Sequence, residues 1–349
     1  MSWTKKLLNW YNLYKRNLPW RKTKNPYLIW ISEIILQQTT VKQGIPFYEK
    51  FIRKYPKLKL LAKTKEENVL KLWQGLGYYS RARNLHYTSK IILKKHKGII
   101  PSSYDELIKL KGIGDYTASA IGSIAFKLPL TTIDSNVYRF FSRFFGIKKS
   151  ISNSKSLKYF KEKSYEFMDK KNPGDYNQAL MEFGSQICKP RNPNCQKCIF
   201  KNNCYAFNFN KIYDFPVRKK NSRKKIKRFL NYLIIINENE EIIIEKRTKN
   251  DIWKNLYQFP LFETKRENNS INKVQKIALK YNKLVNIKIK KWNLKPIKSI
   301  LSHQELLLTF WLINLDKGVL TKSNYYKLKK YPMPIVLDNF INKFFNLKS

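Results

Sequence analysis

Residues 110–121 read Leu-Lys-Gly-Ile-Gly-Asp-Tyr-Thr-Ala-Ser-Ala-Ile, and the two glycines stand just before an amphipathic segment. Gly112 and Gly114 allow a tight turn and a close approach of the backbone to a partner. The helix that follows would present free N–H groups and the positive end of its dipole to an anion. With Lys111 beside the turn, this pattern predicts a helix–hairpin–helix grip on a phosphate backbone. The alternative is an ordinary turn between two packed helices.

The chain around this hairpin is strongly basic. Its 349 residues include 70 Lys and Arg against 24 Asp and Glu, a net charge of +46. Residues 1–220 and 221–349 are both basic, and a field of this sign attracts phosphate polymers or anionic lipid. Compositional drift is an alternative for part of the excess, because Lys far outnumbers Arg and only Arg makes the bidentate contacts that specific recognition favours.

The length predicts two domains of about 100–200 residues each. Apolar residues make up 43% of the chain, enough for two cores. No apolar run reaches the ~20 residues that span a bilayer. Residues 1–10 contain charges without a continuous apolar stretch behind them, unlike a secretory signal. We therefore expect a soluble, cytoplasmic protein without a membrane segment.

Residues 1–187 show the apolar spacing of helices, divided by proline and glycine. The predicted helical segments are Trp3–Tyr14, Ile29–Val41, Val69–Trp73, Leu85–Leu93 and Tyr116–Phe126. A further stripe of apolar side chains is expected in the core, with Arg139 and Arg143 on the other face; it consists of Val137, Phe140, Phe141, Phe144 and Phe145. The fold class predicted for this region is mostly α.

The composition of the sequence and the pattern of its apolar residues change after residue 210. Residues 218–228 hold eight basic residues in eleven, which indicates a solvated linker, a strap for backbone phosphates, or both. Beyond them we expect a small α+β unit: a hairpin of Phe229–Ile236 and Glu241–Glu245 joined by Asn237–Glu240, a helix at Ser270–Asn282, and strands at Ile297–Leu301 and Leu306–Ile313. The predicted domains are a helical region at 1–210, a basic linker at 211–228 and an α+β domain at 229–349.

All four cysteines lie within seventeen residues, with the spacing C-x6-C-x2-C-x5-C. They are Cys188, Cys195, Cys198 and Cys204. In a cytosolic chain, thiols gathered in this way indicate one metal centre. Four thiolates suit zinc or an iron–sulfur cluster alike, although structural zinc more often has two close pairs of ligands. Ligand chemistry alone leaves both metals open.

Two carboxylates stand in places where they could act in catalysis. Glu33 is flanked by apolar residues, and burial would raise its pKa and retain a proton near neutrality. Asp134 precedes a predicted helix start. The alternatives are a solvated helix face for Glu33 and an N-cap for Asp134. One protonated and one ionised carboxyl group together suit the breaking of a glycosidic bond through an oxocarbenium-like transition state.

Residues 75–84 read Gly-Leu-Gly-Tyr-Tyr-Ser-Arg-Ala-Arg-Asn. A flexible turn of this kind could insert an aromatic ring into a base stack while its two arginines hold phosphates. The alternative is a helix start whose aromatic rings belong to the core. The three histidines, His86, His96 and His303, are too scattered for a catalytic triad or a histidine-rich metal site.

In their order along the chain, these motifs resemble the MutY-type adenine DNA glycosylases of the helix-hairpin-helix base-excision superfamily. The resemblance rests on residues 30–39, 75–84, 110–117, 132–137 and 177–184 and on the cysteine loop. It covers almost all of residues 1–210. Residues 225–349 resemble the Nudix-like C-terminal domain of that family more loosely, through 253–260 and 301–303.

The resemblance implies an enzyme that flips adenine out of a pair with 8-oxoguanine or guanine and hydrolyses its N-glycosidic bond. It implies a [4Fe–4S] cluster on the four cysteines, a monomer, and mispaired double-stranded DNA as partner. By similarity, Glu33 protonates adenine at N7 and Asp134 stabilises the positive charge at the anomeric carbon. Asn136 supports the carboxylates, and Tyr116 lies beside the sugar.

The same resemblance assigns the residues that contact substrate. Trp20, Arg21 and Gln178 would line the adenine pocket, and Gln38 and Tyr78 would enter the stack near the orphan base. Thr39 is a further expected substrate-binding residue. Ser302 and His303 match the stretch that reads 8-oxoguanine. Two residues depart from the family pattern: Ser135 replaces a common glycine, and Leu301 replaces a common phenylalanine.

The nearest rival is an endonuclease III-like glycosylase with lyase activity on oxidised pyrimidines. Its chemistry needs a lysine amine for the Schiff base, whereas this chain has Tyr116 at the matching hairpin position. A non-enzymatic DNA-binding module with a structural cluster is a second rival, and that rival would need neither Glu33 nor Asp134.

Overall fold

The computed structural model describes residues 2–150, 154–217, 225–237, 241–268, 270–280, 287–315 and 325–345. The chain divides into two compact units. Unit 1 consists of Met1–Lys63 and Asn84–Lys220, and unit 2 of Thr64–Arg83 and Asn221–Ser349. Among the described residues, no helix is both long and apolar enough to cross a membrane.

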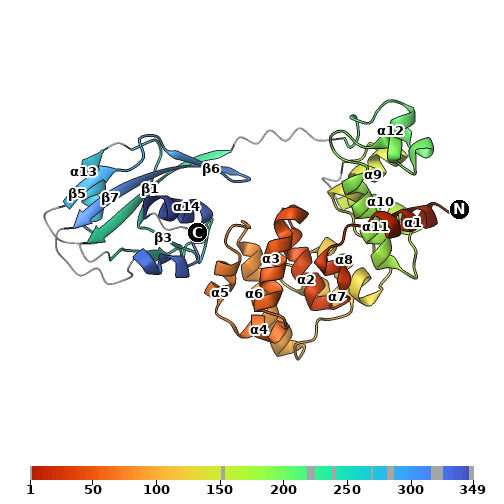
Figure 1. Ribbon diagram of the computed structural model, residues 1–349, viewed down its shortest axis with the longest axis horizontal. Helices are drawn as coiled ribbons and strands as arrows, with labels where there is room; N and C mark the ends of the chain where they lie inside the picture. Colours follow the sequence, from red (N-terminus) through yellow and green to blue (C-terminus); the bar gives the residue numbers. More distant parts are fainter. Residues whose placement is uncertain are drawn as a thin grey trace. The chain divides into compact units, whose positions relative to one another are not determined.

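Unit 1 is helical, which confirms the predicted mostly α class (Figure 1). Its elements are α1 (Trp3–Tyr14), η1 (Pro19–Lys22), α2 (Pro26–Leu36), α3 (Val41–Lys54), α4 (Leu58–Lys63), most of α6 (Ser80–Lys95), α7 (Tyr104–Lys109), α8 (Asp115–Phe126), α9 (Ser135–Phe145), α10 (Ser154–Glu166), α11 (Pro173–Gln186), η2 (Cys195–Lys197), η3 (Lys201–Asn203) and α12 (Tyr205–Asn208).

The core beside α9 is built from aromatic side chains. The predicted stripe of α9 packs there against α1 and α11, with Phe140, Phe141 and Phe144 buried. The opposite face of α9 is not left to solvent, because Arg139 and Arg143 are also buried, 6% and 3% exposed. Backbone carbonyls at the end of α11 and in the segment that follows it accept hydrogen bonds from both guanidinium groups. The helix is therefore enclosed on all sides.

Unit 2 contains a mixed sheet in the order β4–β1–β7–β5, with β6 also paired to β7. The long strands β1 (Ile226–Asn237) and β7 (Gln304–Leu315) run parallel at its centre, and the other pairs are antiparallel. The remaining strands of the unit are β2 (Glu245–Lys246), β3 (Tyr257–Gln258), β4 (Leu261–Thr264), β5 (Ile287–Lys291) and β6 (Ile297–Ile300).

Helices cover both faces of this sheet, because its strands are apolar on both sides. Helix α14 (Ile335–Phe344) packs on the face that carries Leu230 and Phe310, and α13 (Ile271–Ala278) on the face that carries Trp311. Unit 2 also contains α5 (Glu66–Leu72) and the turn η4 (Tyr325–Lys330). These findings confirm the predicted α+β class of the second domain.

Several boundaries differ from those expected. The expected hairpin partner of β1 is represented by one bridge, Ile236 with Ile242, while β1 pairs along its length with β4 and β7. Strands β4 and β5 and helix α14 were not predicted. Part of the basic run, at 218–224, lies outside the described residues, as do Glu238–Glu240 of the expected hairpin turn and the last two residues of the expected helix Ser270–Asn282.

Candidate functional site

A cavity of about 940 Å³ opens in unit 1, between segments far apart in the sequence. It is lined by most of the residues that the resemblance assigned to catalysis and adenine binding: Trp20, Arg21, Glu33, Gln38, Thr39, Tyr116, Asp134, Asn136 and Gln178. They come from η1, α2, α8, α9 and α11 and from the residues that flank these elements. The cavity therefore brings together residues that span almost 160 positions of the chain.

Glu33 is buried in α2, 8% exposed. This helix has apolar residues on nearly every side, so that the carboxyl group of Glu33 is carried into the core region rather than onto a solvated face. Burial raises the pKa of Glu33 from 4.5 to about 7; the Tyr116 hydroxyl opposes this shift and the Asp134 carboxylate adds to it. A buried carboxyl group is harder to ionise because the charged form loses its hydration. Glu33 can therefore hold a proton at neutral pH.

Asp134 is the N-cap of α9, and it also faces the cavity. Its carboxylate accepts hydrogen bonds from the backbone N–H of Asn136 at 2.9 Å and of Val137 at 2.8 Å, and from Asn136 Nδ2 at 2.6 Å. Burial raises the pKa of Asp134, whereas these donors and Arg139 lower it. Glu33 has no comparable set of donors. Of the two carboxyl groups, Asp134 is thus the better stabilised as an anion.

Asn136 is held between Asp134 and a buried arginine. Arg139 Nη2 donates to Asn136 Oδ1 at 2.9 Å and to the Gly184 carbonyl at 2.6 Å, and its Nε donates to the Cys188 carbonyl at 2.7 Å. This arrangement fixes the amide of Asn136 with its nitrogen toward Asp134. Asp134 is therefore both the N-cap of α9 and a carboxylate that Asn136 supports, so the two expected roles do not exclude each other.

Tyr116 lies in the first turn of α8 and forms part of the cavity wall, where it is half-buried. Burial raises its pKa well above 10, and the nearby carboxylates of Glu33 and Asp134 act in the same direction. Its hydroxyl lies 3.1 Å from Met181 Sδ. The phenol therefore stays neutral and offers a proton donor at the edge of the carboxylate pair.

A second charged cluster, formed by Arg16, Arg21 and Glu182, lines this cavity and was not predicted from the sequence. Glu182, on α11, accepts from Arg16 Nε and Nη2 at 2.7 Å and from Arg21 Nη2 at 2.8 Å. Burial alone would raise the pKa of Glu182, but the two arginines lower it to about 2. One signal was present: Gln178 and Glu182 are four residues apart in a helical motif, and such residues share a face.

The glycine hairpin joins α7 to α8 as predicted. Gly112 has φ +86°, and a Cβ there would lie 2.8 Å from the Asn84 Cβ. Gly114 is the N-cap of α8 with an extended backbone, and a Cβ there would meet nothing within 4 Å. Thr88 Oγ1 donates to the Lys111 carbonyl at 2.7 Å, and Lys111 Nζ lies over the Tyr87 ring. Gly112 therefore serves the turn, whereas no described neighbour of Gly114 requires this residue to lack a side chain.

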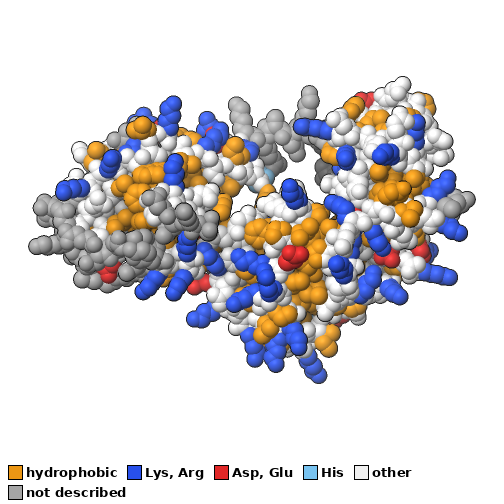
Figure 2. All heavy atoms as spheres, in the orientation of Figure 1, with side chains coloured by type: hydrophobic (Ala, Val, Ile, Leu, Met, Phe, Trp, Pro, Cys, Tyr) orange, Lys and Arg blue, Asp and Glu red, His pale blue; other side chains and the backbone are white. Residues whose placement is uncertain are grey.

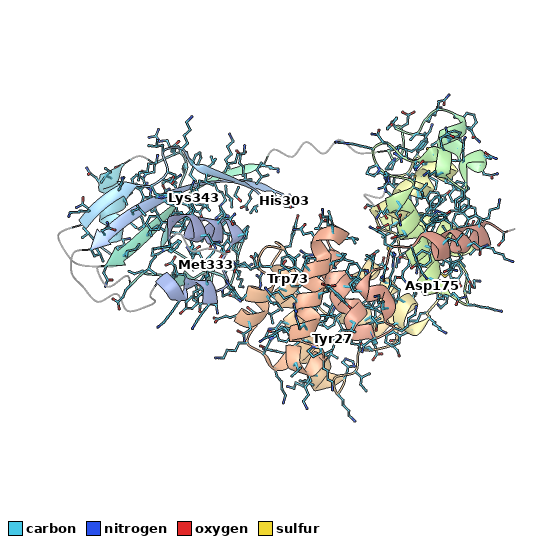
Figure 3. All side chains as sticks on the ribbon, viewed as in Figure 1. Tyr27, Trp73, Asp175, His303, Met333 and Lys343 are labelled. Carbon is cyan, nitrogen blue, oxygen red and sulfur yellow. The ribbon has the colours of Figure 1, made fainter. Side chains whose placement is uncertain are left out.

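Tyr78, Ser302 and His303 do not line the cavity of unit 1; all three belong to unit 2. The Tyr78 hydroxyl is hydrogen-bonded to the Ser302 hydroxyl. Tyr78 is 49% exposed and has φ +47°, a left-handed conformation that is uncommon for tyrosine. Ser302 and His303 form the tip of the β6–β7 hairpin, where Figure 3 marks His303. Tyr78, Ser302 and His303 thus belong to unit 2, whereas Gln38, which the resemblance also assigns near the orphan base, lines the cavity of unit 1.

Arg81 and Arg83, close to Tyr78 in the sequence, were expected to hold phosphates. Their side chains do not extend into solvent. Arg81 Nη2 contacts the carbonyls of Leu76 and Gly77 at 3.3 Å, and its guanidinium lies over the Trp73 ring. Arg83 Nη1 donates to the Lys254 carbonyl at 2.9 Å. These side chains brace the turn from within unit 2.

The four cysteines line one apolar cavity beside α9 in unit 1 and form no disulfide. Burial raises the pKa of the Cys198 thiol to about 12, and it also raises those of Cys195 and Cys204. In the described part of the chain, no three His, Cys, Asp or Glu side chains converge on a single ion. Thiols that line one cavity without pairing with each other are ligands that both structural zinc and iron–sulfur clusters take.

Comparisons with known proteins agree with this geometry. Residues 31–165 match the family model described as HhH-GPD superfamily base excision DNA repair protein. Residues 231–343 match the model of a NUDIX domain. The chain is 38% identical to an adenine DNA glycosylase of Buchnera aphidicola subsp. Baizongia pistaciae, over 91% of this chain and 88% of that protein.

Solved structures share the fold of unit 1. A thermostable thymine-DNA glycosylase is similar with a TM-score of 0.55 and 29% identity, over 59% of this chain and 95% of that one. A trapped endonuclease III–DNA covalent intermediate is similar with a TM-score of 0.52 and 21% identity, over 59% and 94%. At that identity the second likeness shows the fold alone.

Proposed function

The chain belongs to the adenine DNA glycosylase family, and we propose that it removes adenine mispaired with 8-oxoguanine or guanine from duplex DNA by hydrolysing the N-glycosidic bond. The reacting bond is inaccessible within the base stack, so the nucleotide has to be extruded into the cavity of unit 1. The observation that carries this proposal is the presence of Glu33 and Asp134 on one cavity, with the pKa of Glu33 raised to about 7 by burial.

Glu33 is the proposed general acid. A carboxyl group that keeps its proton near neutral pH can protonate the extruded adenine at N7, which makes the base a better leaving group. The resulting Glu33 carboxylate then accepts a proton from the water that attacks the sugar. The neutral hydroxyl of Tyr116 lies where it donates to that carboxylate as it forms.

Asp134 is the proposed stabiliser of the sugar cation. Its three N–H donors hold it as a carboxylate in a buried site, where a fixed negative charge acts strongly on positive charge developing at the anomeric carbon. Asn136, held by Arg139, keeps the carboxylate in one orientation. Ser135 follows Asp134, is exposed at the start of α9 and lines the same cavity.

The adenine pocket is proposed to consist of Trp20, Arg21 and Gln178, with Glu182 and Arg16 behind them. The amide of Gln178 offers a donor and an acceptor, which suits an adenine edge. Glu182 holds Arg16 and Arg21 through charge-assisted hydrogen bonds. These polar side chains are therefore already ordered before adenine enters the pocket. Gln38 and Thr39, at the rim beyond α2, are proposed to approach the DNA strand at the mispair.

Tyr78, Ser302 and His303 are proposed to read the base opposite adenine. Their support is that Tyr78 and Ser302 are already joined in unit 2 and that all three are exposed. Lys111, Gly112 and Gly114 are proposed to hold a DNA backbone phosphate at the N-terminus of α8. Lys and Arg side chains are distributed over the visible faces of both units (Figure 2), as expected for a protein that binds a polyanion.

Cys188, Cys195, Cys198 and Cys204 are proposed to hold a [4Fe–4S] cluster. When bound, the cluster would tie the four cysteines of the 188–204 loop together through iron–thiolate bonds. The residues fit it: four thiols surround one cavity, and no disulfide competes for them. The breaking of the glycosidic bond is assigned to Glu33 and Asp134 alone.

We keep the domain division proposed from the sequence, with a catalytic region at 1–210, a basic linker at 211–228 and a Nudix-like domain at 229–349. The two family matches, at 31–165 and 231–343, support it. One refinement is that Thr64–Arg83 clusters with the C-terminal residues and not with the rest of the catalytic region.

The proposal is tested by adenine release from duplexes that differ only in the opposite base. We expect release opposite 8-oxoguanine and guanine, and little opposite thymine. Release of a pyrimidine, or equal release of adenine from every pair, would contradict it.

A further inference from the structure

Arg143 lies on α9 beside the cysteine loop and is almost completely buried, 3% exposed. Its Nη1 donates to the Lys189 carbonyl at 2.6 Å and lies 3.5 Å from Cys188 Sγ. Its Nε contacts the carbonyls of Ile212 and Phe215 at 2.9 and 3.1 Å, and its Nη2 contacts the Pro190 carbonyl at 3.3 Å. The guanidinium therefore spans the loop from its first cysteine to the segment that leaves it.

This buried cation pairs with no carboxylate in the described part of the chain. The ion pairs found there involve other basic residues, and every oxygen that accepts from Arg143 is a neutral backbone carbonyl. A buried charge is costly unless an opposite charge lies near it. Among the described residues, the sulfur that the guanidinium itself approaches is Cys188 Sγ, one of the proposed cluster ligands, 3.5 Å from Nη1.

Four thiolates on a [4Fe–4S] cluster give the centre a net negative charge. We propose that Arg143 is the buried counter-charge of that centre. It raises the reduction potential of the cluster and the affinity with which the protein holds the cluster. This inference rests on the cofactor proposed above. The cause is electrostatic: a cation next to a ligand sulfur favours the form of the cluster with one more electron, and hydrogen bonds to sulfur act in the same direction.

Arg139, one turn earlier on the same helix, is not equivalent. It contacts the Cys188 carbonyl rather than the sulfur, and its second nitrogen binds Asn136 of the active site. In the described part of the chain, none of the carbonyls that accept from the Arg143 guanidinium belongs to a residue that lines the adenine cavity. Arg143 is therefore a positioning residue for the metal centre and not for the catalytic carboxylates.

The test is the reduction potential of the purified holoprotein, measured by voltammetry on a DNA-free electrode, in wild type, Arg143→Gln and Arg143→Lys. Both substitutions lose most of the carbonyl contacts, but only Arg143→Gln removes the charge. We expect a more negative potential in Arg143→Gln and a potential near that of wild type in Arg143→Lys. Iron affinity in competition with a chelator should fall by about 10- to 100-fold in Arg143→Gln, as is typical when a partner of a metal ligand is removed.

Arg191→Gln is the matched control, because it removes an exposed arginine of the same loop and should leave potential and iron affinity unchanged. An unchanged potential in Arg143→Gln, or equal shifts in both Arg143 variants, would overturn the inference.

If Arg143→Gln does not fold, wild-type protein labelled with ¹⁵N-arginine decides the question. A paramagnetic state of the cluster should then show hyperfine coupling to one arginine, lost in Arg143→Lys, and absence of coupling would overturn the inference. Wild-type protein without iron would overturn the cofactor proposal itself.

Discussion

The carboxylate of Glu67 accepts a hydrogen bond from Lys246 Nζ at 2.6 Å, joining residues 179 positions apart. The Tyr257 hydroxyl donates to the same oxygen at 2.9 Å, and Asn255 Nδ2 donates to Glu66 at 2.7 Å. The Lys246 ammonium group is the first cause that lowers the pKa of Glu67. Helix α5 is thus fastened to the strands β2 and β3 within unit 2.

The ion pair between Lys246 and Glu67 supports the position of the Tyr78 turn. The turn that carries Tyr78 follows α5 directly, so Lys246→Met should loosen Tyr78 relative to Ser302. An exposed pair of this kind contributes at most about 1 kcal/mol, so we expect the preference for 8-oxoguanine over guanine to fall by about 2- to 5-fold, with the melting temperature almost unchanged. Single-turnover adenine release from the two duplexes measures it. Lys249→Met is the control, because Lys249 is exposed on the same unit. An unchanged preference would contradict the prediction.

Glu33→Gln should abolish adenine release while leaving mismatch binding nearly intact. Loss of a general acid typically costs 10²- to 10⁴-fold in rate. Because the pKa of Glu33 is raised to about 7, the wild-type rate should be highest below pH 7 and fall as pH rises through it. Chemical-quench assays of single turnovers across this range measure both effects. Full turnover in Glu33→Gln would refute the assignment.

Stability provides an independent readout of the same residue. The folded-state pKa of Glu33 is raised, so the stability that its protonated form contributes is fully present below pH 4.5 and is lost as pH rises to about 7. Glu33→Gln stays neutral and should therefore be more stable than wild type at pH 8, by up to about 3 kcal/mol, and equal to it at pH 4. Urea unfolding at the two pH values measures the difference. Equal stabilities at both would indicate that Glu33 is solvated.

Two substitutions at Asp134 separate its charge from its role as N-cap. Asn is also a good N-cap, so Asp134→Asn should fold like wild type but lose about 10²- to 10³-fold in adenine release. Asp134→Ala should lose a similar factor in rate and in addition about 1 kcal/mol of stability. Thermal melts and single-turnover kinetics measure the pair. Near-normal activity in Asp134→Asn would show that the site does not need the anion.

Gly112 and Gly114 should respond differently to alanine. Gly112→Ala combines a positive φ with a 2.8 Å approach to Asn84, and should destabilise the protein by ~1–3 kcal/mol. Gly114→Ala meets open space at φ −90°, so stability should change by only a few tenths of a kcal/mol. If a phosphate approaches that backbone, Gly114→Ala should still weaken DNA binding, by a similar factor for every sequence. Fluorescence anisotropy at fixed salt measures it, and unchanged affinity would place the phosphate elsewhere.

The fold class was predictable because hydrophobic periodicity reports burial directly. The stripe from Val137 to Phe145 packs as expected, since aromatic residues at helical spacing leave few other solutions. Strand β5 and helix α14 were missed although both carry a pattern. Ile287–Lys291 alternates apolar and basic residues as a strand does, but over only five residues, and Ile335–Phe344 begins at Pro334 without a side-chain cap.

The members of the candidate site could be named from motifs, but their spatial grouping could not. No local pattern places α2, α8 and α9 around one cavity, and none assigns Tyr78 to unit 2. Arg16 and Arg143 were missed as partners because each acts on a residue tens of positions away. A buried arginine satisfied by carbonyls leaves no periodic signal, since carbonyls are present at every residue.

The assignment of Thr64–Arg83 to unit 2 has a consequence for any attempt to divide this protein. A cut near residue 220 separates the two family-model regions along the sequence, yet it strips α5 and the Tyr78 turn of their packing partners. In the N-terminal fragment, Glu66 and Glu67 of α5 would lose their partners Asn255, Lys246 and Tyr257. Limited proteolysis and expression of isolated halves should therefore yield an easily degraded N-terminal fragment, even though it retains the proposed catalytic residues Glu33 and Asp134.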